Sequence, residues 1–158
     1  MNYCARITTP ASTLETDPLI SVIAVDAGVV YKLEIDFPYG SCRFLHVQIF
    51  DGPTQVWPKT IGESYIGHGT LISFEEEYYK TNAPLEFTIK TWNEDDFYSH
   101  KLQARIFLLS EEQYTNRFLG GGGASGTVDI INTMMQASKS KIKMDAIEAF
   151  KFLGKRKG

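Results

Sequence analysis

An acidic segment at residues 93–96, Asn-Glu-Asp-Asp, is the first candidate for chemistry because it separates two stretches of alternating apolar and polar residues. A connection between two strands would place its oxygens at one rim of a sheet, and Ca²⁺ needs about six to eight oxygen ligands in one place. The candidate ligands are Asn93, Glu94, Asp95 and Asp96, joined by Asp51 from another expected turn. Their spacing does not match an EF-hand loop, so the sequence favours the simpler interpretation of a solvated connection.

Aromatic residues at expected strand ends and loops are the second candidate. A flat ring stacks well on a sugar face, so a carbohydrate platform is one interpretation. Tyrosine and tryptophan at such places also cover the open ends of a sandwich or enter subunit interfaces, where both are enriched. We expect the core or interface role for Trp57, Tyr78, Tyr79, Trp92 and Tyr98.

Catalytic motifs are not evident. Nucleophilic catalysis would need a serine or cysteine in a strained turn beside a histidine and an acid, and no Gly-x-Ser-x-Gly occurs. Residues 121–127 have the glycine spacing of a phosphate-binding loop but lack its lysine. Cys4 and Cys42 have neither metal-ligand spacing nor the pattern of a disulfide framework, which predicts free thiols. The sequence therefore predicts no enzyme and no resident cofactor.

A glycine-rich hinge at residues 120–127 divides the chain into an acidic body and a basic tail. Residues 120–158 contain seven Lys or Arg against three Asp or Glu, so they carry +4 and residues 1–119 carry −7 of the net −3. Apolar side chains recur at helical spacing over residues 128–158, which predicts amphipathic helices ending in a basic cluster. The predicted partner-binding residues are Ile131, Met134, Met135, Ile147, Phe150, Leu153, Lys155, Arg156 and Lys157.

The predicted tail needs a surface that covers its apolar stripe. Nucleic acid is one alternative, but a purely electrostatic arm has no need of apolar side chains. An anionic membrane is another, although a single basic cluster binds membranes weakly at physiological salt. We therefore favour a protein partner within the same assembly, and the sequence leaves open whether the tail docks on its own body or on another copy.

Residues 1–119 predict β-structure. Period-two alternation and intervening turn residues place strands at 19–25, 29–37, 43–50, 54–57, 70–74, 85–92 and 100–109. In the second of these, Val29, Tyr31 and Leu33 are expected to point inward. In the third, Leu45, Val47 and Ile49 are expected to point inward and His46, Gln48 and Phe50 outward. The last two strands are expected to pair as a hairpin. Ser110-Glu-Glu-Gln113 is a capping-box pattern that predicts one or two helical turns.

The predicted fold class is mainly β, an antiparallel β-sandwich that is jelly-roll-like with about seven or eight strands, followed by a C-terminal α-helical arm. The expected domains are an irregular N-terminal arm at 1–18 with at most a short strand near 5–8, the sandwich at 19–119, the hinge at 120–127 and the tail at 128–158. With 158 residues and 43% hydrophobic content, the chain can close one sizeable core but not two.

These features together predict a non-enzymatic structural subunit. The setting we expect is a virion, as a capsid or capsid-associated protein that forms homo- or hetero-oligomers. Neither a secretory signal nor an apolar run of about 18 residues occurs, so we expect cytoplasmic synthesis. The alternative is a calcium- or carbohydrate-binding module that uses the acidic segment and the aromatic residues named above.

Overall fold

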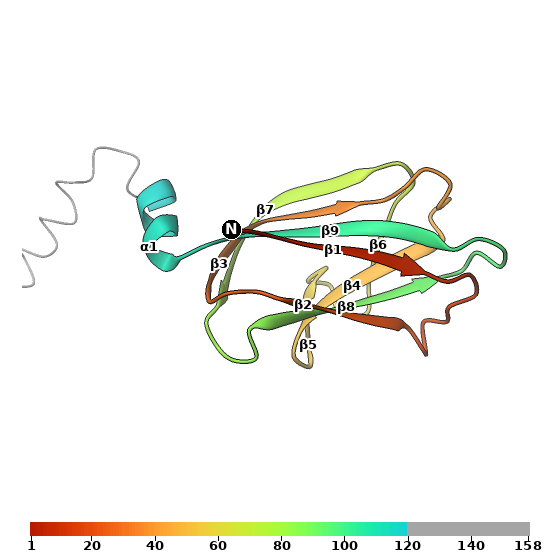
Figure 1. Cartoon of the computed structure of the whole chain (residues 1–158), viewed down its shortest axis with the longest axis horizontal. Coiled ribbons are helices and arrows are strands. Elements are labelled where there is room, and N and C mark those ends of the chain that lie inside the picture. The colour runs from red at the N-terminus through yellow and green to blue at the C-terminus, as the bar shows by residue number, and fades with distance from the viewer. Residues whose placement is uncertain (120–158) are drawn as a thin grey trace, which may run out of the picture. The chain divides into compact units, whose positions relative to one another are not determined.

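The computed structural model describes residues 1–119, in which strands dominate (Figure 1). The strands are β1 (Asn2–Thr9), β2 (Leu19–Ala24), β3 (Gly28–Asp36), β4 (Leu45–Asp51), β5 (Thr54–Trp57), β6 (Tyr65–Ile66), β7 (Leu71–Lys80), β8 (Glu86–Asn93) and β9 (His100–Leu109). They are followed by a short helix, α1 (Glu111–Tyr114), and a single π-helical turn, η1 (Thr115–Leu119). The predicted hinge at 120–127 and tail at 128–158 lie outside the described residues.

The strands form two antiparallel sheets (Figure 1). One sheet has the order β1-β9-β3-β7, and the other has the order β2-β8-β4-β5, with β6 also paired to β4. Side chains from both sheets belong to one hydrophobic cluster, so the arrangement is β-sandwich-like. Residues Met1–Tyr114, which contain both sheets, form one compact unit, and a second unit begins at Thr115.

The core follows from alternation along the strands. On β4, Leu45, Val47 and Ile49 are fully buried, as the sequence predicts; on the other face His46 and Phe50 are half-buried, but Gln48 is buried, contrary to the expectation. The largest apolar side chains that are fully buried come from both sheets: Trp57, Phe37, Phe87, Leu33, Ile35, Leu45, Ile49, Ile89, Leu102, Ile106 and Leu108.

The expected inward face of β3 is wrong at Tyr31. The register of β3 against both neighbours shifts between Val30 and Lys32, which marks a β-bulge. Because of the extra residue, Val30 joins the core and Tyr31 is only half-buried, with its ring 6.1 Å from that of Phe107. Alternation read from the sequence assumes an unbroken pleat and cannot show such a shift.

The expected hairpin between residues 85–92 and 100–109 is also wrong. Both strands exist, as β8 and β9, but they belong to different sheets. β8 lies between β2 and β4, and β9 lies between β1 and β3. The connection at 94–99 therefore crosses from one sheet to the other, because alternation determines which face a strand buries and not which strand it pairs with.

The N-terminal segment differs from the expected irregular arm. Residues 2–9 form β1, which pairs with β9 from Asn2↔Phe107 to Thr9↔His100. Ile7 and Thr9 point inward and are buried. The apolar–polar alternation of this segment is weak in the sequence. Its main-chain hydrogen bonds with β9 hold it in the sheet where its side chains give little signal. Residues 10–18 lie outside the strands, as expected.

The capping box at the start of α1 is confirmed. The Gln113 amide donates to Ser110 Oγ at 3.2 Å, and the Ser110 amide donates to Gln113 Oε1 at 3.3 Å. α1 lasts one turn before the π-helical η1 begins. In the part of the chain that the structure describes, no helix has the length and apolar character needed to cross a membrane.

Candidate functional site: the free edge of strand β2

The acidic segment predicted from the sequence is a self-contained connection. The Asp95 carboxylate accepts the amides of Phe97 (2.8 Å) and Tyr98 (3.0 Å), and its other oxygen lies 2.9 Å from His100 Nε2. These contacts, led by the two amides, hold the pKa of Asp95 below its ordinary value. The Asn93 side chain is buried and donates to the carbonyls of Pro10 and Tyr98. Their polar groups are thus committed to holding the loop in place.

The five candidate calcium ligands do not converge. Asp51 lies at the far end of β4 from Leu45, and Leu45 is the residue that pairs with Asn93. Asp51 instead contacts Tyr78 OH at 2.7 Å and Lys80 Nζ at 2.5 Å. Among residues 1–119, no three His, Cys, Asp or Glu side chains are grouped so that they could hold a metal ion.

The five candidate aromatic residues differ in exposure, with two buried, Tyr78 half-buried and two exposed. Trp57 and Trp92 are 1% and 4% exposed, and the Trp57 ring packs 5.3 Å from the rings of Tyr78 and Phe87. Tyr79 and Tyr98 are 51% and 70% exposed. Tyr79 lies near the end of β7 that pairs with the start of β3, whereas Tyr98 precedes β9 at the opposite end of the sheets. The five residues therefore do not form one sugar-binding platform.

A serine and a histidine from separate segments do meet. Ser64 Oγ lies 2.8 Å from His46 Nδ1, and His46 Nε2 is buried 3.5 Å from Glu94 Oε1. The His46 ring stacks on Trp92 at 4.8 Å, and Ser64 directly precedes β6, which pairs with β4 at His46. We interpret this cluster as the contact that fixes β6 on β4. Its partners come from three segments, so the sequence did not reveal it.

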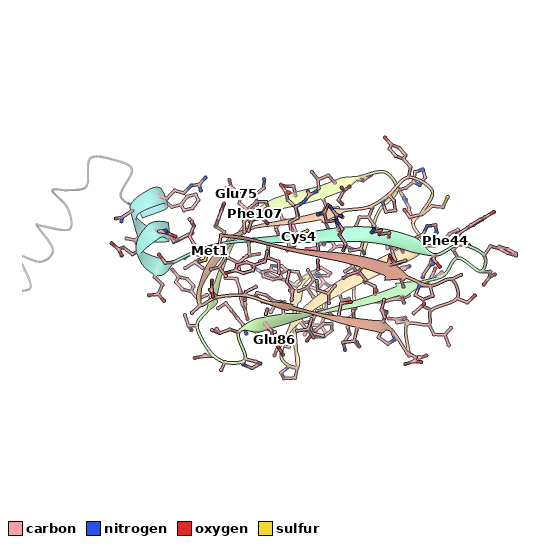
Figure 2. All side chains as sticks on the ribbon, in the orientation of Figure 1. Met1, Cys4, Phe44, Glu75, Glu86 and Phe107 are labelled. Carbon is pink, nitrogen blue, oxygen red and sulfur yellow. The ribbon has the colours of Figure 1, made fainter. Side chains whose placement is uncertain are left out.

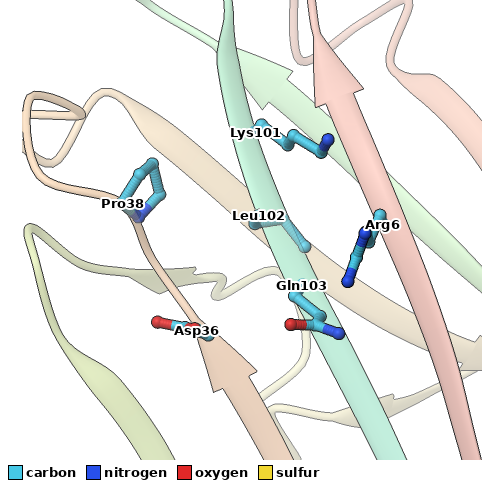
Figure 3. A pocket seen from close by; sticks show the side chains of 6 residues that line it. All are labelled: Arg6, Asp36, Pro38, Lys101, Leu102 and Gln103. Atoms are coloured by element: carbon cyan, nitrogen blue, oxygen red, sulfur yellow. The ribbon is translucent and has the colours of Figure 1, made fainter.

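A shallow depression of about 300 Å³ lies across β1, the end of β3 and the start of β9 (Figure 3). Arg6 and Lys101 are exposed beside it, and Asp36 lies 3.8 Å from Arg105. Gln103 Nε2 is 2.7 Å from Cys4 Sγ, and both cysteines are free and exposed, as predicted. With cations and a carboxylate at the same opening, the depression shows no preference for one ligand charge.

The sheet edges differ in how they are protected from other strands. β7 carries three consecutive glutamates at 75–77, and β1 carries Arg6. The β5 edge is covered by residues 58–64, several of whose carbonyls accept hydrogen bonds from the side chains of Gln48 and Gln55. β2, Leu-Ile-Ser-Val-Ile-Ala, has no charge and no proline, and within residues 1–119 it pairs with β8 alone. Charges and covering loops are the usual protection of an edge, whereas β2 carries no charge and, in the part of the chain that the structure describes, has no strand on its second side.

The outward backbone groups of β2 belong to Ile20, Val22 and Ala24. Residues of an antiparallel pair alternate between hydrogen-bonded and non-bonded positions. The Val25 amide donates to the Leu85 carbonyl at 2.9 Å, so Val25 is a hydrogen-bonded position. In the same register, Ile23 and Ser21, two and four residues earlier, are hydrogen-bonded positions as well. The amides and carbonyls of the residues between them point away from β8 toward the open edge.

The same three residues carry exposed apolar side chains. Ile20 is 51% exposed and Val22 is 55% exposed, and Ala24 is exposed beside them. Their neighbours across the ladder are Lys90, Thr88 and Glu86. An uncharged edge with an apolar outer face is the combination that pairs with another strand. Sequence reasoning missed this site, because in a run of six mostly apolar residues nothing distinguishes the inward from the outward set.

Comparison with known proteins gave no match, whether to protein-family models, to curated proteins or to solved structures. The predicted tail residues, Ile131 to Arg156 and Lys157, lie outside the described part of the chain. The candidate site therefore rests on β2 and the elements around it.

Proposed function

We propose that this chain is a non-enzymatic structural subunit of a larger assembly, of the kind that builds or lines a virion, and that its β-sandwich is a jelly roll. Copies associate through the free edge of β2, and the C-terminal arm docks on a partner. The observation that carries the proposal is that Ile20, Val22 and Ala24 combine exposed apolar side chains with backbone groups that no strand within residues 1–119 pairs.

The strand order supports a jelly roll. With the two-residue β6 set aside, the first strand pairs with the last, β1 with β9, and the pairing continues inward as β2 with β8, β3 with β7 and β4 with β5. Successive pairs alternate between the two sheets. This is the pattern of one long hairpin rolled around a common core, and capsid and lectin domains use it. The fold alone does not choose among these functions.

A second copy of the chain suits the β2 edge better than an unrelated strand. Two β2 strands related by a two-fold axis at Val22 would pair Val22 with its counterpart and Ile20 with Ala24 of the other copy. About six main-chain hydrogen bonds would form, and each copy would lose its open edge. No charge lies on β2 to oppose its own copy. The contact is isologous and leaves other surfaces for further subunits.

The test compares Ile20→Glu with Ile61→Glu in the full chain by light scattering and sedimentation. Ile20 faces Lys90, so a glutamate there adds a favourable cross-strand pair in the monomer but places a charge in the proposed contact. Ile61 is 87% exposed in the segment between β5 and β6, and the same substitution there controls for added charge.

We expect the wild-type chain and Ile61→Glu to be dimers or larger and Ile20→Glu to lose the β2 contact, with at least a halving of mass if that contact is the main one. Val22→Pro should act likewise, because its amide takes no part in the ladder with β8. A monomeric wild-type chain at micromolar concentration, or an Ile20→Glu variant that assembles as the wild type does, would overturn the proposal.

A further inference from the structure

We infer that the surface formed by the connections at 10–18 and 94–99, together with Phe44, binds the basic C-terminal segment of a second copy of this chain. We call this surface the loop end. The inference rests on the proposed function, since it names the partner on which the arm docks. It concerns a different surface from the β2 edge, so the two can fail separately.

The loop end is held in a fixed shape by its own hydrogen bonds. The Ser12 amide donates to the Asp95 carbonyl at 2.8 Å, and the Asn93 amide donates to the Thr13 carbonyl at 3.0 Å. The Glu94 amide donates to the Phe44 carbonyl at 2.9 Å, which adds the β3–β4 connection. A surface ordered in advance binds with less loss of conformational freedom.

Large apolar side chains project from this fixed framework into solvent. Phe97 is 85% exposed and Tyr98 is 70% exposed, although Asp95 binds the amides of both. Leu14 and Phe44 are 64% and 41% exposed on the adjoining connections. Figure 2 places Phe44 at the end of the sheets opposite Met1. Rigid aromatic side chains that contact little of their own chain are typical anchors of a binding surface.

The charge of the loop end selects the partner's chemistry. Glu15, Asp17, Glu94 and Asp96 are exposed there, and the neighbouring cations are Arg43 next to Phe44 and Lys101 at the start of β9. A partner that offers apolar side chains with several cations would satisfy both the aromatic anchors and these carboxylates.

Residues 139–157 of the chain have this composition. They contain seven Lys or Arg against two Asp or Glu, interspersed with Ile147, Phe150 and Leu153. β9 begins beside the loop end and ends at the opposite end of the sheets, where α1 follows (Figure 1). The chain therefore leaves its sheets at the end far from the loop end, so a copy's own segment would have to run back along the full length of β9 to reach it.

Photo-cross-linking in the full chain tests the inference. Benzoylphenylalanine replaces Phe97, and ¹⁵N-labelled and unlabelled copies are mixed so that mass spectrometry separates links between copies from links within one copy. Ile61, an exposed residue in the segment between β5 and β6, is the control position. We expect mixed-isotope links from position 97 to residues 139–157 and none from position 61 to that segment.

Charge reversal supplies the second arm. Lys155→Glu with Arg156→Glu and Lys157→Glu should reduce these links several-fold, and Glu15→Lys with Asp17→Lys should restore them. Links within single copies only, links from position 97 to other segments, or no links would each overturn the inference. In the Ile20→Glu variant, the cross-links from position 97 should persist. Loss of assembly through β2 with retained cross-links would show that only the edge contact was disrupted.

Discussion

The ion pair between Lys80 and Asp51 is expected to hold the two sheets together, and Asp51→Ala tests this. Lys80 ends β7 in one sheet and is 2% exposed, while Asp51 ends β4 in the other. Lys80 Nζ lies 2.5 Å from Asp51 Oδ1 and 5.4 Å from the centroid of the Phe87 ring. Without the Asp51 carboxylate, the buried Lys80 ammonium group keeps the weak attraction of the Phe87 ring face in place of its ion pair.

Breaking a buried ion pair by removing one partner costs about 3–5 kcal/mol of unfolding free energy. The Asp51 side chain is 23% exposed, so water can reach the site. We therefore expect Asp51→Ala to lose about 3 kcal/mol of unfolding free energy, the lower end of this range. Against a total stability of about 5–15 kcal/mol, this loss lowers the melting temperature by roughly 10–20 °C. Lys80→Met keeps the apolar stem and removes the charge, so the double variant should regain most of the loss.

Urea unfolding of the wild type, both single variants and the double variant gives the coupling energy. The buried indoles of Trp57 and Trp92 provide the fluorescence signal. A coupling of about 2 kcal/mol is expected for a pair that shares one buried contact. A loss below about 1 kcal/mol in Asp51→Ala, or no recovery in the double variant, would refute the reasoning, because such values belong to surface ion pairs.

Three further outcomes are expected. Burial and the hydrogen bond to Asp51 raise the pKa of Tyr78 from 10.0 to about 12, so unfolded Tyr78 loses its proton first and the free energy of unfolding falls as the pH rises through this range. Tyr78→Phe should flatten that slope in urea titrations. Gly28→Ala places a methyl group 2.3 Å from the Leu109 carbonyl oxygen, so the β3–β9 ladder must shift and the melting temperature should fall by several degrees; an unchanged value would contradict the contact. Ser110→Ala removes one half of the capping box and should cost up to about 1 kcal/mol, with faster amide exchange at Gln113 as the local readout.

The proposed assembly sites differ in how visible they were in the sequence. The basic tail was evident from charge alone, because seven cations in the last 39 residues oppose an acidic body. The β2 edge was not evident, because Ile20 and Val22 cannot be distinguished from Leu19 and Ile23 by residue type. The exposure of these side chains and the direction of the amides depend on pairing, since β2 has β8 on one side and, among residues 1–119, no strand on the other.

The acidic segment shows the opposite case, in which the residues were evident and their role was not. By residue type and position, Asn93 and Asp95 are candidate oxygen ligands for a cation or part of a solvated connection. In the folded chain their polar groups bind backbone amides and carbonyls brought from residues 10–13 and 97–98. A carboxylate close to backbone amides that need an acceptor uses its oxygens for those hydrogen bonds and does not offer them to a cation.

By itself the sequence determined the β-class, the positions of most strands, the inward residues of β4 and the capping box of α1, because these depend on alternation and contacts within a few residues. The tertiary structure decided which strands pair, since pairing depends on backbone groups that all strands share. It placed β8 and β9 in different sheets, turned residues 2–9 into an edge strand and shifted the inward face of β3 at a bulge. Within the described residues it also left one edge of β2 without a paired strand, and such an edge exists only after every other strand has found its place.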